Sequence, residues 1–436
     1  MPLLAPVATI ESLDHEGRGV AHVDGKVVFI EGGLPGEKVE YSSYRKRASF
    51  EQATMVRVIR ASAQRADPRC KFFGMCGGCS MQHAELGAQV AAKQRVMEDA
   101  IKRIGKVDIG SVYPAIYGPA WGYRYRGRLS VRVIPRKGGV LVGFHEKKSS
   151  YIADITSCEI LPVHISALLV PLRGLIARLS APDRIPQIEV AVGDDRTVLA
   201  LRNLQPFTSK DKATLLSFGE EHAVSMWQQP GGPETAYPLR AGEPEFLHYT
   251  LPEFDLSLKF RPTDFTQVNV HINRLLIRRA MQLLDPQPRE RIADLFCGLG
   301  NFTLPIARSG ATVVGVEGSA ALVQRAVENA AANGLSGHSE FRLSNLFEAT
   351  PESLRALGPL DKILIDPPRE GAIAVVNALN ENLPRRIVYV SCNPATLARD
   401  AAVLCHEKGY VMRGAGVANM FPHTSHVESI ALFELP

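Results

Sequence analysis

From about Lys259 to the end of the chain, short apolar runs alternate with stretches of helical pattern, and this alternation restricts the fold more than any other feature. The runs lie at residues 292–296, 312–316, 362–365 and 387–390. Such alternation is typical of βαβ units, in which helices cover both faces of a parallel sheet. We therefore expect residues 256–436 to form a Rossmann-type α/β domain.

The preceding part of the chain has two other patterns. At about 150 residues per domain, 436 residues suggest three domains. Residues 1–60 contain short alternating runs separated by turn pairs such as Asp24-Gly25, which predict hairpins and a small β-barrel. Residues 61–255 combine a helical stretch at 84–104 with strand-like runs at 128–134 and 187–192, which predicts a mixed α+β domain. The fold class is therefore a multidomain α/β protein.

Composition excludes several classes of protein. An apolar fraction of 45% with 22% charged residues is ordinary for a globular chain and excludes disorder. No run reaches the roughly 18 apolar residues of a membrane span, and the N-terminal residues lack the pattern of a secretory signal. We expect a cytoplasmic protein with no membrane association. In that reducing compartment, the seven cysteines are better explained by metal binding or catalysis than by disulfides.

A glycine-rich loop follows the run at residues 292–296. It reads Cys297-Gly298-Leu299-Gly300-Asn301-Phe302, and Glu317 ends the next run. Glycines let the backbone approach a ligand, and an acid at the end of the second strand accepts hydrogen bonds from a ribose. Thr303 stands where a dinucleotide-binding loop has its third glycine, so an adenosyl ligand other than NAD is favoured. The alternative is a tight turn without a ligand.

Chemically reactive side chains follow the two later runs, where ligands of open α/β sheets bind. Asp366-Pro367-Pro368-Arg369 follows the run at 362–365, and Ser391-Cys392-Asn393-Pro394 follows the run at 387–390. The tail at 423–428 adds two histidines and Glu428, and precedes a final strand that can fold back beside them. A nucleophilic thiol is one interpretation, and a small buried hydrophobe is the other.

Four further cysteines predict a metal site. Cys70, Cys76 and Cys79 lie in a glycine-rich loop, and Cys158 lies downstream. Four thiolates suit either tetrahedral zinc or an iron-sulfur cluster, and their spacing does not decide between the two. Four unligated thiols are the alternative.

The net charge of +5 conceals one strongly basic segment, residues 121–148. Aromatic residues alternate with arginines there, a pattern that suits phosphate contact combined with base stacking. A half-buried strand with a solvated basic face is the alternative. Eight basic residues stand against the single acid Glu146, and Trp121, Tyr123 and Tyr125 lie among them: Arg124, Arg126, Arg128, Arg132, Arg136, Lys137, Lys147 and Lys148.

Together, five ordered motifs resemble the RNA uracil-5-methyltransferase family. They are Phe265-x-Gln267-x-Asn269, the loop from Asp294 to Phe302, Asp366-Pro367-Pro368-Arg369, Ser391-Cys392-Asn393-Pro394 and His426-Val427-Glu428. Residues 10–37 are similar to the TRAM domain, a small RNA-binding β-barrel. With the cysteine cluster, this segment makes the chain most similar to the family branch that carries an iron-sulfur cluster and acts on 23S ribosomal RNA.

The resemblance implies a reaction and its residues. A specific uridine of 23S ribosomal RNA, flipped out of its stack, would be methylated at C5 by S-adenosylmethionine. Cys392 would add to uracil C6, and Glu428 would remove the C5 proton. Cys70, Cys76, Cys79 and Cys158 would hold a [4Fe-4S] cluster, and Phe265 is a candidate for stacking on a base. No obligate protein partner is expected. The cofactor-contact positions of the family correspond here to Gln267, Phe296, Asn301, Glu317, Asn345 and Asp366.

Two other functions are compatible with parts of this pattern. An RNA amino-methyltransferase would use the Asp-Pro-Pro loop and would need no thiol at Cys392. A non-enzymatic RNA-binding protein would use the barrel and the metal site, and would not bind S-adenosylmethionine.

Overall fold

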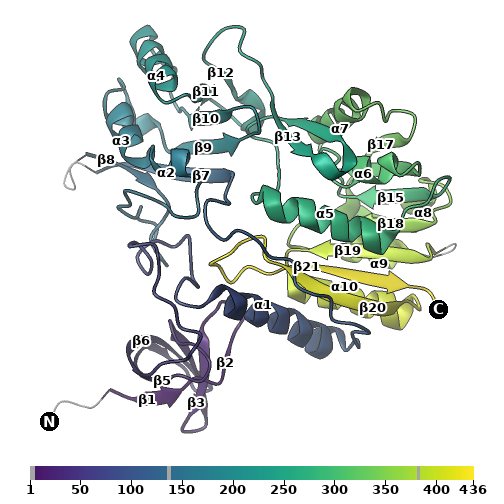
Figure 1. Ribbon diagram of the computed structural model, residues 1–436, viewed down its shortest axis with the longest axis horizontal. Coiled ribbons are helices and arrows are strands. Elements are labelled where there is room, and N and C mark those ends of the chain that lie inside the picture. The colour runs from purple at the N-terminus through teal and green to yellow at the C-terminus, as the bar shows by residue number, and fades with distance from the viewer. Residues whose placement is uncertain (1–4, 135–138, 381–382) are drawn as a thin grey trace.

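The computed structural model describes residues 5–134, 139–380 and 383–436 (Figure 1). Arg136 and Lys137 of the basic segment lie outside the described residues. Within those ranges, no helix has both the length and the apolar character that crossing a bilayer requires.

The N-terminal part forms one six-stranded sheet in the order β1-β5-β6-β4-β3-β2. Its pairs are antiparallel except β4 with β6. A two-residue turn at Asp24-Gly25 joins β3 to β4, and both residues have positive φ, which confirms the hairpin expected there. The strands are β1 Val7–Thr9, β2 Ser12–Leu13, β3 Gly19–Val23, β4 Lys26–Glu31, β5 Lys38–Lys46 and β6 Phe50–Arg60.

The central part contains a second six-stranded sheet, in the order β12-β11-β10-β9-β7-β8. Helices pack on it around a separate apolar core, so the expected mixture of helices and strands is confirmed. A two-stranded sheet, β13–β14, follows. The elements are α1 Leu86–Ala100, β7 Arg126–Ile134, β8 Gly139–Gly143, α2 Val163–Ser166, α3 Leu169–Ala177, β9 Gln187–Val192, β10 Thr197–Arg202, α4 Ser209–Glu221, β11 Ser225–Gln229, β12 Tyr237–Pro238, β13 Leu247–Leu251 and β14 Leu256–Phe260.

The C-terminal part is a seven-stranded sheet in the order β17-β16-β15-β18-β19-β21-β20. The first five strands are parallel, as the alternating pattern predicts, and β21 is antiparallel to both of its neighbours. Helices cover both faces (Figure 1). The elements are α5 Val270–Leu284, β15 Arg291–Leu295, α6 Thr303–Arg308, β16 Thr312–Glu317, α7 Ala320–Ala332, β17 Ser339–Leu343, α8 Pro351–Arg355, β18 Lys362–Ile365, α9 Ile373–Ala378, β19 Arg386–Ser391, α10 Pro394–Ala402, β20 Val411–Ala418 and β21 Glu428–Glu434.

Helix α1 packs on this sheet although it precedes the whole central sheet in the sequence. Figure 1 shows α1 beside α10 and β20, and its residues Val90 and Met97 belong to the same apolar cluster as one face of the seven-stranded sheet. The segment at 112–116 also bridges to β20. Helix α1 and the segment at 112–116, which both precede residue 120, therefore belong to the packing and pairing of the C-terminal sheet.

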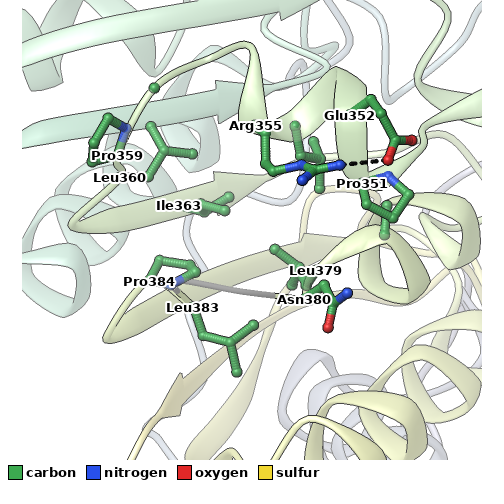
Figure 2. A pocket seen from close by; sticks show the side chains of 13 residues that line it. Pro351, Glu352, Arg355, Pro359, Leu360, Ile363, Leu379, Asn380, Leu383 and Pro384 are labelled. Atoms are coloured by element: carbon green, nitrogen blue, oxygen red, sulfur yellow. Dashed lines mark hydrogen bonds and ion pairs between the residues drawn. The ribbon is translucent and has the colours of Figure 1, made fainter.

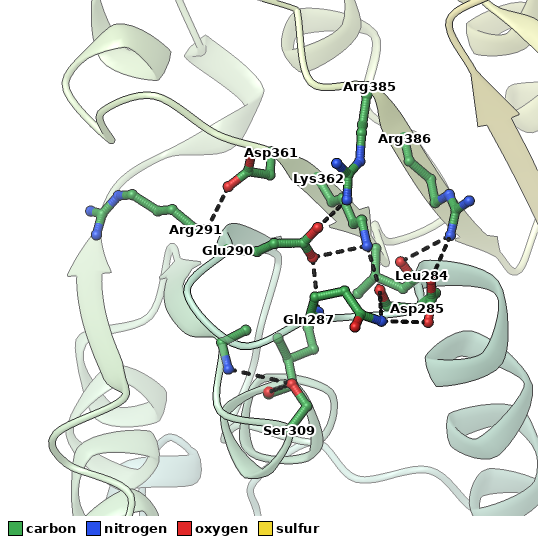
Figure 3. A network of polar contacts seen from close by, with 12 residues as sticks. Leu284, Asp285, Gln287, Glu290, Arg291, Ser309, Asp361, Lys362, Arg385 and Arg386 are labelled. Carbon is green, nitrogen blue, oxygen red and sulfur yellow. Dashed lines mark hydrogen bonds and ion pairs between the residues drawn. The ribbon is translucent and has the colours of Figure 1, made fainter.

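Charged side chains at the amino ends of the parallel strands form a paired network (Figure 3). Lys362 begins β18, and its Nζ lies 2.8 Å from Oε2 of Glu290, just before β15. Arg385, just before β19, pairs with the same carboxylate. Because Lys362 is buried, this pairing removes the large cost of an isolated buried charge and fixes the starts of three strands.

Candidate active site

Strand pairing brings Cys392 and Glu428 to neighbouring positions. Strands β19 and β21 are antiparallel, and Ser391 is paired with Ser429. Cys392 directly follows Ser391 and Glu428 directly precedes Ser429, so both residues adjoin the last pair of this register. The expectation that the last strand folds back beside the thiol is therefore confirmed. Sequence spacing alone could not show it, because this contact depends on the register of the pair.

The loop that carries Cys392 is joined to the loop that carries Asp366. Asn393 caps α10 through its Oδ1, which accepts from the Ala395 N–H at 3.0 Å. Its Nδ2 donates to the Arg369 carbonyl at 3.0 Å. One asparagine therefore fixes the thiol at a helix N-terminus and holds the Asp-Pro-Pro-Arg loop next to it.

The acids in this crevice lie in surroundings that oppose ionisation. Burial, and after it the nearby Asp366, raises the pKa of Glu428 to about 8. Burial raises the pKa of Asp366 to about 7. The pKa of the Cys392 thiol rises to about 12 through burial, Glu428 and Asp366, whereas Arg369 lowers it. Strongly shifted titratable groups gathered in one crevice are typical of proton-transfer sites.

The glycine-rich loop between β15 and α6 lies at the same carboxyl edge. Gly300 has a φ of +99°, which an L side chain rarely adopts, and a Cβ at Gly298 would meet nothing within 4 Å. Glu317 at the end of β16 accepts from the Gly298 N–H at 3.1 Å and from the Ser319 N–H at 2.9 Å. The carboxylate is therefore placed beside an open backbone, where a ribose hydroxyl could bind it.

The other predicted cofactor positions lie around this loop. Asn301 Oδ1 accepts from the Tyr249 hydroxyl and from Asn273 Nδ2, both at 3.0 Å. Gln267 is half-buried and lines a small cavity that also contacts Asn273. Asn273 therefore contacts Asn301 directly and lines one cavity together with Gln267.

An aromatic pair lies at the start of the loop. Phe296 and Phe347 meet edge to face, with ring centroids 5.7 Å apart. Asn345 caps the turn that carries Phe347, since its Oδ1 accepts from the Phe347 N–H at 3.2 Å. Phe296 and Asn345 therefore lie close together, next to an aromatic side chain, Phe347, that could cover an adenine.

The four predicted metal-ligating cysteines gather at one place in the central part. Cys70, Cys76, Cys79 and Cys158 all line one small cavity together with Phe72 and Phe144. Burial, and to a lesser extent the neighbouring cysteines, raises the pKa of Cys79 to about 12. Within the described ranges, however, no three His, Cys, Asp or Glu side chains are spaced to hold a single metal ion.

Comparison with known proteins decides the family. Residues 243–435 match the family described as tRNA (Uracil-5-)-methyltransferase, and residues 8–40 match the TRAM domain. A protein of Aromatoleum aromaticum, 23S rRNA (uracil(1939)-C(5))-methyltransferase RlmD, is 68% identical over 430 residues, covering 98% of this chain and 99% of that protein. The chain belongs to the RNA uracil-5-methyltransferase family. The resemblance identified from the sequence motifs is thereby confirmed.

Further relatives agree with this assignment to the uracil-5-methyltransferases. The protein of the same name in Nitrosospira multiformis is 60% identical over 434 residues, covering 99% of both chains. Among solved structures, the tRNA (uracil-54, C5)-methyltransferase of Pyrococcus abyssi, in complex with S-adenosyl-L-homocysteine, has a TM-score of 0.75 at 22% identity. It covers 98% of this chain and 100% of its own, so the fold is shared along the whole length.

In this uracil-5-methyltransferase, some basic side chains of residues 121–148 are paired with acids of the protein, so fewer are available to RNA than the sequence suggests. Arg128 Nε donates to Glu189 at 2.8 Å, and Lys147 pairs with Glu31 of the N-terminal sheet at 2.9 Å. The alternating aromatic residues and arginines do not all lie in a strand, because β7 begins only at Arg126. Tyr123 is buried and its hydroxyl donates to the Pro422 carbonyl at 3.0 Å, so it is not available to stack on a base.

A large cavity of this uracil-5-methyltransferase lies away from the crevice. Figure 2 shows it between α8, α9 and the loops that precede β18 and β19. Its lining is mostly apolar, including Leu360, Ile363 and Leu379. Because it lies toward the amino ends of the strands, whereas ligands of such sheets bind at the carboxyl ends, we assign no part of the site to it.

Two residues of the crevice were not among the predicted site residues. Asp294 is fully buried at the end of β15, accepts a hydrogen bond from the Thr303 hydroxyl, and has a pKa raised by burial to about 7. Its position in the motif from Asp294 to Phe302 was the sequence feature that could have identified it. Lys93 on α1 interacts electrostatically with Glu428. Nothing in the local helical pattern distinguishes it from a solvated lysine.

Proposed function

We propose that this protein transfers the methyl group of S-adenosylmethionine to C5 of a uridine in 23S ribosomal RNA. The observation that carries the proposal is the cross-strand neighbourhood of Cys392 and Glu428 beside the glycine-rich loop. The substrate is taken from the relatives at 60–68% identity, whose names specify uracil 1939 of 23S rRNA. Such a reaction takes place in the cytoplasm, where we expect the protein to act.

The proposed chemistry begins at Cys392. Uracil C5 is a weak nucleophile, and addition of the Cys392 thiolate to C6 moves the C5=C6 electron pair toward C5 and O4. Bound S-adenosylmethionine would supply the methyl group from its sulfonium, and S-adenosylhomocysteine would leave with the electrons of the broken sulfur–methyl bond. After C5 is methylated, the Glu428 carboxylate takes the C5 proton, the C5–H electrons restore the C5=C6 bond, and the C6–S bond breaks. Cys392 is regenerated and Glu428 is left protonated.

The cofactor would be held by the residues around the glycine-rich loop. Glu317 would exchange its contact with Gly298 for a ribose hydroxyl, because its carboxylate already lies beside the open side of that loop. Phe296 and Asn345 would border the adenine. The remaining members of the proposed set would contact the rest of the cofactor: Gln267, Asn301 and Asp366.

The cysteine cavity supports a [4Fe-4S] cluster held by Cys70, Cys76, Cys79 and Cys158. A single zinc ion needs all four sulfurs about 2.3 Å from one centre. Four cysteine thiolates are also a usual ligand set of a four-iron cluster. All four thiols line one cavity, and the choice of the cluster over zinc rests on the resemblance to the family branch that carries such a cluster. The methylation steps require no electron, so its role would be structural or in RNA binding.

The uridine must leave its stack to reach the crevice. Extruding a base costs a few kcal/mol, which contacts elsewhere on the RNA would offset. Phe265 is 69% exposed in the loop that leads to Gln267, so its ring is available for a displaced base. We propose that residues 1–60 form a unit that makes a second RNA contact. Residues 61–255 would form the cluster-bearing unit, and residues 256–436 would form the catalytic unit.

The proposed function is tested by methyl transfer to defined RNA. The purified protein is incubated with S-adenosylmethionine labelled in its methyl group and with 23S ribosomal RNA, a transfer RNA, or a 23S fragment in which the uridine at 1939 is cytidine. We expect label in 23S RNA at that uridine and none in the cytidine fragment. Label in the exocyclic amine of another base, or preference for the transfer RNA, would contradict the proposal.

A further inference from the structure

The segment that connects β20 to β21 passes through a strained residue, His423. Its φ is +67°, in the left-handed region that residues other than glycine adopt uncommonly. Among the described residues other than glycine that have a positive φ, His423 is the only buried one. A strained conformation persists only where the surrounding structure fixes it, and such conformations gather at functional sites. The contacts of His423 therefore indicate its role.

The backbone of His423 is held by residues from a distant part of the chain. Its carbonyl accepts from the N–H groups of Ser80 and Met81, both at 2.9 Å. Its own N–H donates to Gln89 Oε1 on α1 at 2.8 Å. Two residues further on, the Ser425 N–H donates to Ser80 Oγ at 3.1 Å. The strained segment is therefore fixed from outside its own sheet, and Figure 1 shows α1 beside β20, as these contacts require.

The side chain of His423 is held as well. Its ring stacks on Trp121 with the ring centroids 3.8 Å apart, and its Nδ1 lies 3.2 Å from Gln89 Nε2. The residue before it is also fixed, because the Pro422 carbonyl accepts from the Tyr123 hydroxyl at 3.0 Å. Contacts to the N–H, the carbonyl and the ring together keep His423 in its left-handed conformation.

The turn that follows His423 leads to the carboxyl of Glu428. The Thr424 hydroxyl donates to the Phe421 carbonyl at 2.9 Å, and its oxygen accepts from the His426 N–H at 3.3 Å. The His426 ring meets Phe421 edge to face, with centroids 4.5 Å apart. These contacts place His426 Nε2 3.9 Å from Glu428 Oε2. Displacing His423 would therefore move His426 away from the carboxyl.

The other parts of the crevice are held independently of this segment. The backbone of Glu428 is paired with Ala418 of β20. The loop that carries Cys392 is held by Asn393, which caps α10 and donates to the Arg369 carbonyl. A change in the segment should therefore disturb the surroundings of the Glu428 carboxyl while it leaves the thiol in place.

We propose that His423 is a positioning residue for proton removal by Glu428, and that its fixed, strained backbone sets the 421–426 segment against the carboxyl. This inference rests on the proposed function. In the step that it serves, the Glu428 carboxylate takes the uracil C5 proton and the C5–H electrons form C5=C6. The C6–S bond to Cys392 breaks, and its electrons return to the sulfur. His423 neither gains nor loses a proton.

The experiment separates the backbone of His423 from its ring. His423→Ala removes the ring and leaves a residue for which the left-handed backbone is unfavourable. His423→Asn also removes the ring, but asparagine tolerates that backbone. Gln89→Leu removes the acceptor of the His423 N–H and leaves His423 unchanged. His222→Ala is the matched control, because it removes a ring packed on Phe218 of the central part, with centroids 4.3 Å apart.

Each variant is mixed with a 23S fragment and S-adenosylmethionine in a single turnover, and samples are quenched in detergent. The rate at which the covalent protein–RNA adduct appears and the rate at which it decays are followed separately. Binding of RNA, binding of S-adenosylmethionine and the unfolding temperature are measured on the same preparations.

We expect His423→Ala and Gln89→Leu to slow adduct decay by about tenfold or more, because misplacing a reacting group by about 1 Å can cost about 10²-fold. Adduct formation and the affinities for RNA and S-adenosylmethionine should stay close to wild-type values, since Cys392 is held by other contacts. His423→Asn should restore most of the decay rate, because it relieves the backbone strain. His222→Ala should keep the wild-type rates.

Wild-type decay in folded His423→Ala and Gln89→Leu would overturn the role of His423. Equal slowing of formation and decay would also overturn it, because the loss would then be a general loss of structure. So would equal losses in His423→Ala and His423→Asn, because the backbone conformation would then have no part. If His423→Ala does not fold, Gln89→Leu decides.

Glu428→Gln distinguishes failure of this inference from failure of the proposed function. If Glu428→Gln accumulates adduct while His423→Ala and Gln89→Leu decay normally, only the role of His423 is wrong. If Glu428→Gln turns over normally without accumulating adduct, the elimination mechanism itself is wrong.

Discussion

In the seven-stranded sheet, charged residues gather both at the amino ends of the strands (the amino edge) and at their carboxyl ends (the carboxyl edge). The pKa values of the carboxyl groups shift in opposite directions at the two edges. At the amino edge, Glu290 lies between Lys362 and Arg385 (Figure 3), and although burial works against ionisation, these partners lower the pKa of its carboxyl. At the carboxyl edge, Asp366 and Glu428 face one another and the pKa of each is raised. Paired charges stabilise the fold at the amino edge. At the carboxyl edge, the two neighbouring acids lower stability and remain able to exchange protons.

This difference shows how a structural network can be distinguished from a site. The amino edge has the stronger ion pairs and lies nearer the large cavity of Figure 2. Neither feature indicates chemistry. The carboxyl edge has few ion pairs among the described residues, but it gathers a thiol, three buried acids and an open glycine-rich loop. Perturbed groups without compensating partners therefore mark the function better than charge density does.

The largest effect is expected at the carboxyl edge. Cys392→Ala should lower the methylation rate by at least about 10³-fold, because the nucleophile is removed. Unfolding temperature and cofactor binding should remain near wild-type values. Cys405→Ala, which truncates a half-buried thiol behind β20, is the matched control and should retain activity. If Cys392→Ala still methylated RNA, the assignment of the chemistry to the carboxyl edge would be contradicted.

At the amino edge the loss should be in stability. Lys362→Met removes the buried partner of the Glu290 carboxylate, and breaking a buried ion pair costs about 3–5 kcal/mol. Denaturant unfolding should show this loss, while methylation per folded molecule stays unchanged. Arg355→Met, at a surface pair with Glu352, should change stability by less than about 1 kcal/mol. A specific loss of methylation in folded Lys362→Met would show that the edges are coupled.

Glu317→Gln should weaken cofactor binding without changing the fold. A hydrogen bond to a charged group contributes about 1.5–3 kcal/mol, so the dissociation constant measured by calorimetry should rise about 10–100-fold. Glu348→Gln, an exposed position near the same edge, serves as the control. Equal affinities for the wild type and Glu317→Gln would show that this carboxylate does not hold the ribose.

The smallest effect is in the pH dependence of stability. Because the pKa of Glu428 is raised in the folded state to about 8, its carboxyl binds a proton more tightly there than in the unfolded chain. Its contribution to stability is therefore fully present below its ordinary pKa and is lost as pH rises through about 8. Glu290, with a lowered pKa, contributes in the opposite sense, and its contribution is lost at acid pH.

Glu428→Gln should consequently unfold at a higher temperature than the wild type at pH 9, and at nearly the same temperature at pH 4. Glu290→Gln should be less stable than the wild type at pH 7, and this difference should shrink toward pH 3. Thermal unfolding across this range checks both. Parallel pH profiles for the two variants would contradict the contrast between the edges.

Local pattern was sufficient to predict one kind of feature and not another. The parallel strands, the glycine-rich loop and Cys392 follow from alternation and from residues at strand ends, which are local properties. Lys93 could not be predicted, because it lies 326 residues from Asn419 and its burial depends on α1 packing against β20. Tyr123 was expected among the aromatic residues that could stack on RNA bases, but it is buried, because a non-local contact with Pro422 decides its surroundings.

The central claim is that Cys392 bonds covalently to uracil C6 during methylation. A 23S fragment with 5-fluorouridine at the target position cannot lose a C5 proton, so the adduct should be trapped. We expect a stoichiometric detergent-stable complex that depends on S-adenosylmethionine, with the methylated nucleotide attached to Cys392 in peptide mass spectra, and none with Cys392→Ser. Attachment at another residue, or methylation of normal RNA with no trapped complex, would contradict the claim.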